Sequence, residues 1–255
     1  MKTAIIIPSR HGSQRLPQKA LHLINGRTLI ERVYRRCSLA ISIDAIFVAT
    51  DHESIATHVE SFGGQVIMTS PDCPSGTDRV AAAAEMLGPE YEIILNVQGD
   101  EPLIAPEVIT SLAEAMQHDP TLAAATPITK VRHVADLHSP NVVTVVTDDE
   151  WNALYFSRHP IPFLRDHGPS PSDEWLRHQV YYKHIGVYAY RRPTLQAFTL
   201  LGESSLERAE RLEQLRLLQA GIPIRCVRVE YESVAVDTID DVRMVEAILE
   251  REGWE

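Results

Sequence analysis

The sequence predicts an α/β fold in which a mainly parallel sheet is flanked by helices. The first half of the 255-residue chain alternates short apolar runs, rich in β-branched residues, with longer segments of helical periodicity. Proline, glycine, asparagine or aspartate bounds most of the apolar runs, as is common for buried strands. Such alternation is typical of right-handed βαβ units, which place parallel strands side by side.

The elements expected before residue 120 follow this alternation. The strands are Ala4–Pro8, Ala45–Ala49, Val66–Met68 and Ile93–Val97, and the helices are Leu29–Ala40, Glu53–Ser61, Asp78–Met86 and Glu107–Gln117. Thr50 and Glu53 have the spacing of a capping box, and Gly63-Gly64 is expected to end the helix that they introduce.

A mixed-strand insertion is expected in the second half, because strand-like runs lie closer together there. These runs are Leu122–Ile128, Val142–Thr147, Ala153–Phe156, Tyr181–Tyr190 and Ile224–Val229. Helices are expected at Pro193–Thr199, at Leu206–Gln219 behind a Ser204/Glu207 capping box, and at Ile239–Glu250. A proline-rich segment (Pro160, Pro162, Pro169 and Pro171, with Gly168) is expected to be a mobile loop or an oligomer contact.

The composition excludes several classes of protein. Hydrophobic residues make up 44% and charged residues 23%, which is typical of a globular chain. The net charge of -11 argues against general nucleic-acid binding and against adhesion to anionic membranes. Cys37, Cys73 and Cys226 form no CxxC pair, which fits a reducing compartment. With no apolar stretch of membrane-spanning length and no signal-peptide pattern, we expect a cytoplasmic location.

A basic loop after the first strand is the most informative motif. The run Ile5–Ser9 is followed by Arg10, Arg15 and Lys19. This loop would lie at the carboxyl end of a strand, where open α/β sheets bind ligands, and its cations suit a polyphosphate. The spacing of the usual P-loop is missing, and an exposed loop without a ligand is the alternative.

A second apolar run ends in carboxylates. Ile93–Val97 is followed by Gln98-Gly99-Asp100-Glu101. Mg²⁺ is commonly held by one or two carboxylates together with substrate phosphates. A single aspartate after a strand is usually a turn former, but with the basic loop it favours a metal-nucleotide site.

These segments belong to a longer series of motifs. In order they are Ile7-Pro8-Ser9-Arg10, Arg15-Leu16-Pro17-x-Lys19, Ala49-Thr50-Asp51, Ser75-Gly76-Thr77-Asp78-Arg79, Asn96-Val97-Gln98-Gly99-Asp100-Glu101-Pro102, Leu154-Tyr155-Phe156-Ser157-Arg158, His184-Ile185-Gly186-Val187-Tyr188, Leu212-Glu213-Gln214-Leu215-Arg216 and Val236-Asp237-Thr238. Through them the chain resembles the 3-deoxy-manno-octulosonate cytidylyltransferases (CMP-Kdo synthetases) nearly from end to end.

The resemblance implies a nucleotide-diphospho-sugar-transferase-like (Rossmann-like) fold in one domain over residues 1–255. Residues 1–120 would bind the nucleotide, 121–235 would bind the sugar and form a dimer, and 236–255 would supply a metal ligand and the closing helix. It also implies a Mg²⁺-dependent transfer of CMP from CTP to Kdo, giving CMP-Kdo and pyrophosphate for lipopolysaccharide biosynthesis. A homodimer is implied as well.

The resemblance also assigns roles to residues of this chain. The catalytic set is Arg10, Arg15, Lys19, Asp100 and Asp237, of which Asp100 and Asp237 would be the metal ligands. The nucleotide set is Pro8, Ser9, Arg10, Lys19, Ser75, Arg79 and Gln98. The sugar set is Tyr155, Ser157, Arg158, His184, Tyr188, Glu213 and Gln214, with Arg158 as the clamp for the sugar carboxylate.

Structural alternatives stand beside these roles. Val236-Asp237-Thr238 could be an N-cap arrangement before a helix, His184 a core histidine, and Glu213-Gln214 part of a solvated helix face. The histidines show no HExxH pair, and no zinc site is predicted from them.

The chain also departs from the family pattern. Thr144 stands where a lysine is frequent, and Gln18 replaces a common glycine before Lys19. These departures keep open a transfer to another acid sugar, 8-amino-Kdo or a sialic acid. A degenerate nucleotide-binding protein without catalysis is the alternative from a different class.

Overall fold

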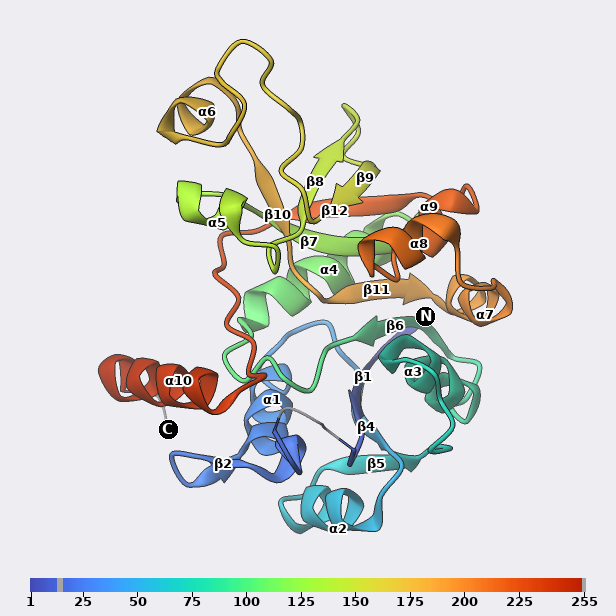
Figure 1. The fold of residues 1–255 in the computed structure, drawn as a ribbon. Helices are drawn as coiled ribbons and strands as arrows, with labels where there is room; N and C mark the ends of the chain where they lie inside the picture. The colour runs from blue at the N-terminus through green and yellow to red at the C-terminus, as the bar shows by residue number, and fades with distance from the viewer. Residues whose placement is uncertain (13–15, 254–255) are drawn as a thin grey trace. The chain divides into compact units, whose positions relative to one another are not determined.

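The computed structural model describes residues 1–12 and 16–253 (Figure 1). Arg15 of the predicted phosphate loop therefore lies outside the described residues. The chain divides into two compact units, the first formed by residues 1–114 with 232–255 and the second by residues 115–231. The single domain over residues 1–255, with parts ending at 120 and 235, stays a prediction.

The first unit is built on a parallel sheet. Its strands are β1 (Lys2–Ser9), β4 (Ala45–Thr50), β5 (Gln65–Met68) and β6 (Tyr91–Asn96), in the order β5-β4-β1-β6. Around them come α1 (Leu29–Cys37), α2 (Glu53–Ser61), α3 (Gly76–Glu85) and α10 (Ile239–Glu252), together with the 3₁₀ helix η1 (Lys19–Leu21) and the short strands β2 (Leu23–Ile24) and β3 (Arg27–Thr28). The helix α4 (Pro106–His118) includes residues of both units. The predicted parallel α/β core is confirmed.

The apolar run of β1 fills the centre of this sheet. Ile5, Ile6 and Ile7 are fully buried, as expected where both faces of a parallel strand are covered. The register pairs Ile6 with Asn96 of β6, and the amide of Val97 donates to the carbonyl of Ile6 (3.3 Å). The segments that follow β1 and β6 therefore leave the sheet at the same edge.

The second unit contains the predicted mixed strands. β7 (Ala124–Lys130) pairs antiparallel with β10 (Tyr182–His184) and β11 (Tyr188–Arg191), and parallel with β12 (Ile224–Arg228). β8 (Thr144–Thr147) pairs antiparallel with β10 and with β9 (Ala153–Ser157). Its helices are α5 (Val134–His138), α6 (Asp173–His178), α7 (Arg192–Leu200), α8 (Ser205–Glu210) and α9 (Leu215–Gln219).

Two long elements predicted in the second unit are broken. The expected strand Tyr181–Tyr190 is interrupted between β10 and β11, where the Thr126 hydroxyl lies 2.8 Å from the carbonyl of Val187. The expected helix Leu206–Gln219 divides into α8 and α9, because Arg211 adopts the left-handed conformation (φ 55°). The Ser204/Glu207 capping box is confirmed at the start of α8.

Other boundaries also differ from the prediction. The Thr50/Glu53 capping box is wrong: His52 is the N-cap of α2 and accepts from the amide of Ser54, while Thr50 is buried at the end of β4. α6 (Asp173–His178) follows the proline-rich segment directly, and no helix was expected there. No helix formed by the described residues is both long and apolar enough to cross a membrane.

Candidate functional site

The central feature of the first unit is a lysine placed between two aspartates. The Nζ atom of Lys19 lies 2.8 Å from Oδ2 of Asp100 and 2.8 Å from Oδ1 of Asp237. Lys19 begins η1, Asp100 follows β6, and Asp237 precedes α10. The structure thus brings together three of the predicted catalytic residues, which are far apart in the sequence.

Backbone contacts fix the two aspartates relative to each other. The amide of Val236 donates to the carbonyl of Asp100 (2.8 Å), so the segments that carry the carboxylates run side by side. Thr238 is the N-cap of α10 and forms a capping box with Asp241. The expected N-cap arrangement of Val236-Asp237-Thr238 is thus present, with Thr238 as the cap, and the carboxylate of Asp237 is directed to Lys19.

Asp241 supports this geometry from the first turn of α10. Its carboxylate accepts from the amides of Asp237 (2.9 Å) and Thr238 (2.8 Å). Burial acts to raise the pKa of Asp241, but these hydrogen bonds outweigh it and the pKa is lowered. An ionised Asp241 therefore holds the backbone of Asp237 in place.

The conformation before Lys19 is one that glycine adopts more readily. Gln18 has φ 52° and ψ 36°, in the left-handed region. Its side chain makes no capping hydrogen bond to η1. Gln18 thus forms the backbone turn that presents Lys19 at a conformational cost of about 1–2 kcal/mol.

Close backbone approach brings the ends of β1 and β6 together. A Cβ atom on Gly99 would lie 2.9 Å from the carbonyl oxygen of Pro8, so glycine is required there. A Cβ on Gly76 would lie 3.4 Å from Oε1 of Gln98 and 3.6 Å from Cγ of Pro8. The side-chain Nε2 of Gln98 donates to Oδ1 of Asn96 (2.8 Å), which orients the Gln98 side chain. Pro8, Gln98 and the start of α3 thus lie close together in the first unit.

Arg79 forms an ion pair with Asp51, a residue that was not among the predicted site residues. Its guanidinium is buried and donates to Oδ2 of Asp51 (2.8 Å) and to Oγ1 of Thr69 (2.6 Å). Asp51 in turn accepts from the amide of His11 (3.1 Å), next to Arg10. The motif Ala49-Thr50-Asp51 was the signal that could have identified Asp51.

Three other residues of the nucleotide set lie at the ends of β1 and α3. Ser75 is the N-cap of α3, and its hydroxyl accepts from the amide of Asp78. Ser9 is buried at the end of β1, and Arg10 is exposed directly after it. Contacts of Ser9, Arg10, Ser75 and Arg79 with a nucleotide stay predictions.

In the second unit, Glu210 connects three of the predicted sugar-binding residues. Its Oε1 accepts from the hydroxyl of Ser157 (2.8 Å), and its Oε2 accepts from the amide of Arg158 (2.9 Å). Tyr155 is close enough to be affected as well: burial first, and then the Glu210 carboxylate, raise the pKa of Tyr155. Sequence reasoning missed Glu210, and only its position three residues before Glu213-Gln214 pointed to it.

The guanidinium of Arg158 is fixed by main-chain carbonyls. Its Nε donates to Glu210 (2.8 Å), Nη1 to Pro140 (3.0 Å) and Nη2 to Arg211 (3.2 Å). Each Nη atom has two hydrogens, so each retains donor capacity beyond these bonds. The carboxylate-clamp role of Arg158 stays a prediction, and this geometry gives it a rigid cation.

Two further residues of the sugar set, His184 and Gln214, have buried side-chain nitrogens. Nε2 of His184 and Nε2 of Gln214 are buried without a hydrogen-bond partner among the described residues. The His184 ring contacts Phe156 and Tyr188, each with ring centroids 5.3 Å apart, and burial lowers the pKa of His184 to about 3. A neutral imidazole and a carboxamide with unsatisfied nitrogens are suited to hydroxyl groups of a ligand.

Tyr188, the second tyrosine of the sugar set, is kept protonated. Burial raises the pKa of Tyr188 well above its usual value, and Tyr190, Glu213 and Cys226 add to this. Tyr188 therefore offers a phenolic hydroxyl at neutral pH.

A parallel sheet with a lysine and paired carboxylates at its carboxyl edge defines a nucleotidyltransferase-like α/β protein. A model of the cytidylyltransferases matches residues 4–228. The chain is 46% identical to the 3-deoxy-manno-octulosonate cytidylyltransferase of Pelobacter propionicus, covering 95% of each chain, and 45% identical to that of Myxococcus xanthus, covering 99% of this chain and 98% of the other. The chain therefore belongs to the 3-deoxy-manno-octulosonate cytidylyltransferase family.

Solved structures agree with this assignment. A CMP:2-keto-3-deoxy-manno-octonic acid synthetase complexed with CTP is similar with a TM-score of 0.91 and 40% identity, covering 99% of this chain and 100% of that one. A 4-diphosphocytidyl-2C-methyl-D-erythritol synthase from Anaerococcus prevotii is similar with a TM-score of 0.65 and 16% identity, covering 98% of this chain and 99% of that one. The second likeness concerns the fold alone.

Proposed function

We propose that this protein transfers CMP from CTP to 3-deoxy-D-manno-octulosonate (Kdo), forming CMP-Kdo and releasing pyrophosphate. The relatives of similar length bear the name of this activity, and the related synthetase was solved with CTP. The observation that carries the proposal is the placement of Lys19 between Asp100 and Asp237. It provides a cation and two anions at the sheet edge where a triphosphate would bind.

The reaction is an in-line displacement at the α-phosphorus of CTP. The anomeric hydroxyl of Kdo forms a new P–O bond and loses its proton, while the bond to the β-phosphate breaks and pyrophosphate leaves. The task of the protein is to hold anions in line and to offset their charge. Lys19 is a point charge on a flexible stem and can bind phosphate oxygens, and Arg10 and Arg15 are proposed to assist it.

Asp100 and Asp237 fit a Mg²⁺ site. Their carboxylates already converge on one cation, and oxygen ligands are those that Mg²⁺ prefers. Bound there, Mg²⁺ would supply charge neutralisation at the phosphates. Asp241 fixes the backbone of Asp237, so that its carboxylate stays directed to the same place.

The second unit supplies groups for an acidic, hydroxyl-rich sugar. Arg158 would bind the carboxylate, held by its three carbonyl partners. The unpartnered nitrogens of His184 and Gln214 would bind hydroxyls, together with Tyr155, Ser157, Tyr188 and Glu213.

Thr144, which replaces the family's frequent lysine, has a structural role here. Its hydroxyl donates to the carbonyl of His159 (2.8 Å) and accepts from the amide of Ile161 (3.2 Å). This buried group organises the chain that follows β9. A sugar other than Kdo, such as 8-amino-Kdo or a sialic acid, is the second candidate substrate because a cation is absent at this position.

The test is pyrophosphate release with Kdo and Mg²⁺, run in parallel with CTP, UTP, ATP and GTP. Release with CTP alone, lost on chelation, is the expected result. Release with 8-amino-Kdo or a sialic acid but not with Kdo would establish the second candidate. If folded protein bound CTP but released no pyrophosphate with any of these sugars, the catalytic proposal would be overturned.

The location and assembly are part of the same proposal. We expect a homodimer in the cytoplasm, supplying an activated sugar for lipopolysaccharide biosynthesis. Sedimentation of the purified protein tests the dimer, and a monomer at micromolar concentration would contradict it.

A further inference from the structure

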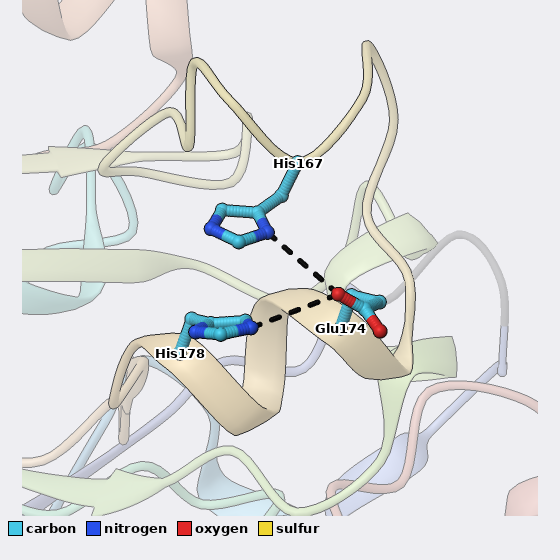
Figure 2. Close-up of side chains that lie close together, drawn as sticks. All are labelled: His167, Glu174 and His178. Carbon is cyan, nitrogen blue, oxygen red and sulfur yellow. Dashed lines mark ion pairs between the residues drawn. The ribbon is translucent and has the colours of Figure 1, made fainter.

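A cluster of two histidines and a glutamate lies in the second unit, outside every motif of the proposed reaction. His167 comes from the proline-rich segment, and Glu174 and His178 come from α6 (Figure 2). One potential ligand atom of each residue lies within 4.8 Å of those of the other two. Since Glu174 and His178 are four residues apart in a helix, they present their side chains on the same face.

The two oxygens of the Glu174 carboxylate contact different partners. Its Oε2 lies 3.7 Å from Nδ1 of His167 and 3.7 Å from Nε2 of His178, while its Oε1 accepts from Arg177 (3.0 Å). The two imidazoles are stacked, with centroids 4.1 Å apart and an interplanar angle of 25°. Figure 2 shows one nitrogen of each ring directed to the same carboxylate oxygen of Glu174.

The spacing of these atoms is close to that of a metal site. Tetrahedral zinc with ligand bonds of about 2.0–2.2 Å places its ligand atoms about 3.4 Å apart. The two N–O contacts of 3.7 Å need to contract by tenths of an ångström, and the two ring nitrogens lie within 4.8 Å of each other. Glu174 and His178 are half-exposed, which leaves room for water as a further ligand.

The apolar core holds the loop residue of the cluster in place. The indole of Trp175 donates to the carbonyl of His167 (3.0 Å), and the amide of His167 donates to the carbonyl of Leu164 (3.2 Å). Trp175 is buried in a cluster with Val131, Leu137 and Tyr181. Gly168, with φ +87°, then lets the chain turn away. The backbone of His167 is thus held by hydrogen bonds that do not involve the side chains of the other two ligands.

We propose that His167, Glu174 and His178 bind a divalent first-row transition ion of the Zn²⁺ type, which fastens the proline-rich loop to α6. Two imidazoles and one carboxylate suit this class of ion, whereas Mg²⁺ and Ca²⁺ prefer oxygen ligands. The site differs in ligand chemistry from the Asp100/Asp237 pair. Its role is structural, because it restrains residues 159–172 against the helix that follows them.

Metal titration of the full-length protein tests the proposal. Protein stripped with EDTA is titrated with ZnCl₂ by calorimetry in excess Mg²⁺, which occupies oxygen-rich sites. One Zn²⁺ site is expected in the wild type, weakened at least about tenfold in His178→Gln and in His167→Gln. His138→Gln, at an exposed histidine of α5, is the matched control and should bind like the wild type.

Proteolysis gives a local readout of the same site. Zn²⁺ should slow tryptic cleavage after Arg165 and Arg177 several-fold in the wild type and in His138→Gln, but not in His178→Gln. Cleavage after the exposed Arg208 serves as the internal reference. Glu174→Gln, which keeps the shape of the side chain, replaces the histidine variants if those fail to fold. Zn²⁺ binding and protection that persist in the ligand variants, or no Zn²⁺ binding by the wild type, would overturn the proposal.

Discussion

Asp100 and Asp237 share one cation, because the Lys19 ammonium lies 2.8 Å from a carboxylate oxygen of each. Like charges that converge in this way repel each other unless a positive charge lies between them. Lys19 therefore has two possible partners during the proposed reaction, the carboxylates and the triphosphate. The site can be tested by removing either charge.

Removing one carboxylate should abolish turnover without loss of the fold. Asp237→Asn keeps the shape of the side chain but removes its charge, and the same holds for Asp100→Asn. Each should lower the rate of pyrophosphate release by about 10²-fold or more, since charge stabilisation at the phosphates is lost. Asp240→Asn is the matched control: Asp240 is exposed and pairs with Arg243 on the surface, so its removal should change the rate little. Equal rates in Asp237→Asn and Asp240→Asn would remove Asp237 from the site.

Removing the lysine should have opposite effects on the two ligands. Lys19→Met leaves the carboxylates of Asp100 and Asp237 without their shared cation, so the nucleotide-free protein should bind Mn²⁺ several-fold more tightly. The same variant should bind CTP more weakly, because a phosphate-binding charge is lost. Mn²⁺ binding followed by electron paramagnetic resonance and CTP binding followed by calorimetry measure the two effects. Unchanged Mn²⁺ affinity would show that Lys19 does not compete for the carboxylates.

The sequence was sufficient for features that depend on local pattern and chain order. The run Ile5–Ile7 predicted a buried strand, because a continuous run of apolar β-branched residues fits a strand that is covered on both faces. The capping box of Ser204 was predictable from residues three apart. Asp100 and the basic loop that carries Lys19 were predicted to lie at the same edge because both follow strand ends of a parallel sheet, and Lys19 and Asp100 do lie 2.8 Å apart there.

Features that depend on tertiary partners were not predictable in this way. The break at Arg211 has no glycine or proline to mark it, and the surrounding helical periodicity continues through it. Glu210 looked like any other surface carboxylate, since its bonds to Ser157 and Arg158 join segments distant in sequence. The hydrogen bonds of Arg79 to Asp51 and Thr69 could not be predicted for the same reason.

Arg158 should affect the sugar more than the nucleotide. Arg158→Ala removes the proposed carboxylate clamp, so the KM for Kdo should rise far more than the KM for CTP. The loss of its hydrogen bonds to main-chain carbonyls should also lower the free energy of unfolding by about 1–3 kcal/mol. Arg165→Ala, at an exposed arginine of the same unit, is the control for both measurements. Equal changes in the two KM values would count against the clamp.

His184 should make stability depend on pH. Its pKa is 6.5 when exposed and about 3 in the folded chain, so only the unfolded chain binds a proton between these values. The contribution of the neutral His184 imidazole to the free energy of unfolding is therefore fully present above pH 6.5. It is lost as the pH falls, at about 1.4 kcal/mol per pH unit. Urea unfolding of the wild type and of His184→Leu at pH 7.5, 5.5 and 4.5 gives the free energy of unfolding of each protein as a function of pH. The wild type should lose more of it than the variant as the pH falls. Parallel pH profiles would show that the imidazole is protonated equally in both states.

Gly99 should tolerate no side chain, because of its contact with Pro8. A Cβ atom there would lie 2.9 Å from the Pro8 carbonyl oxygen, so Gly99→Ala must push the ends of β1 and β6 apart. The expected cost is about 1–3 kcal/mol in the free energy of unfolding. Because Asp100 follows Gly99 directly, the same displacement should raise the KM for CTP.

Gly202→Ala provides the comparison for this substitution. A Cβ on Gly202 would meet no atom within 4 Å, so stability and KM should stay close to the wild-type values. Thermal unfolding and steady-state kinetics of the two variants measure both effects. If Gly99→Ala matched Gly202→Ala in both, the close approach of the two strand ends would not constrain the position of Asp100.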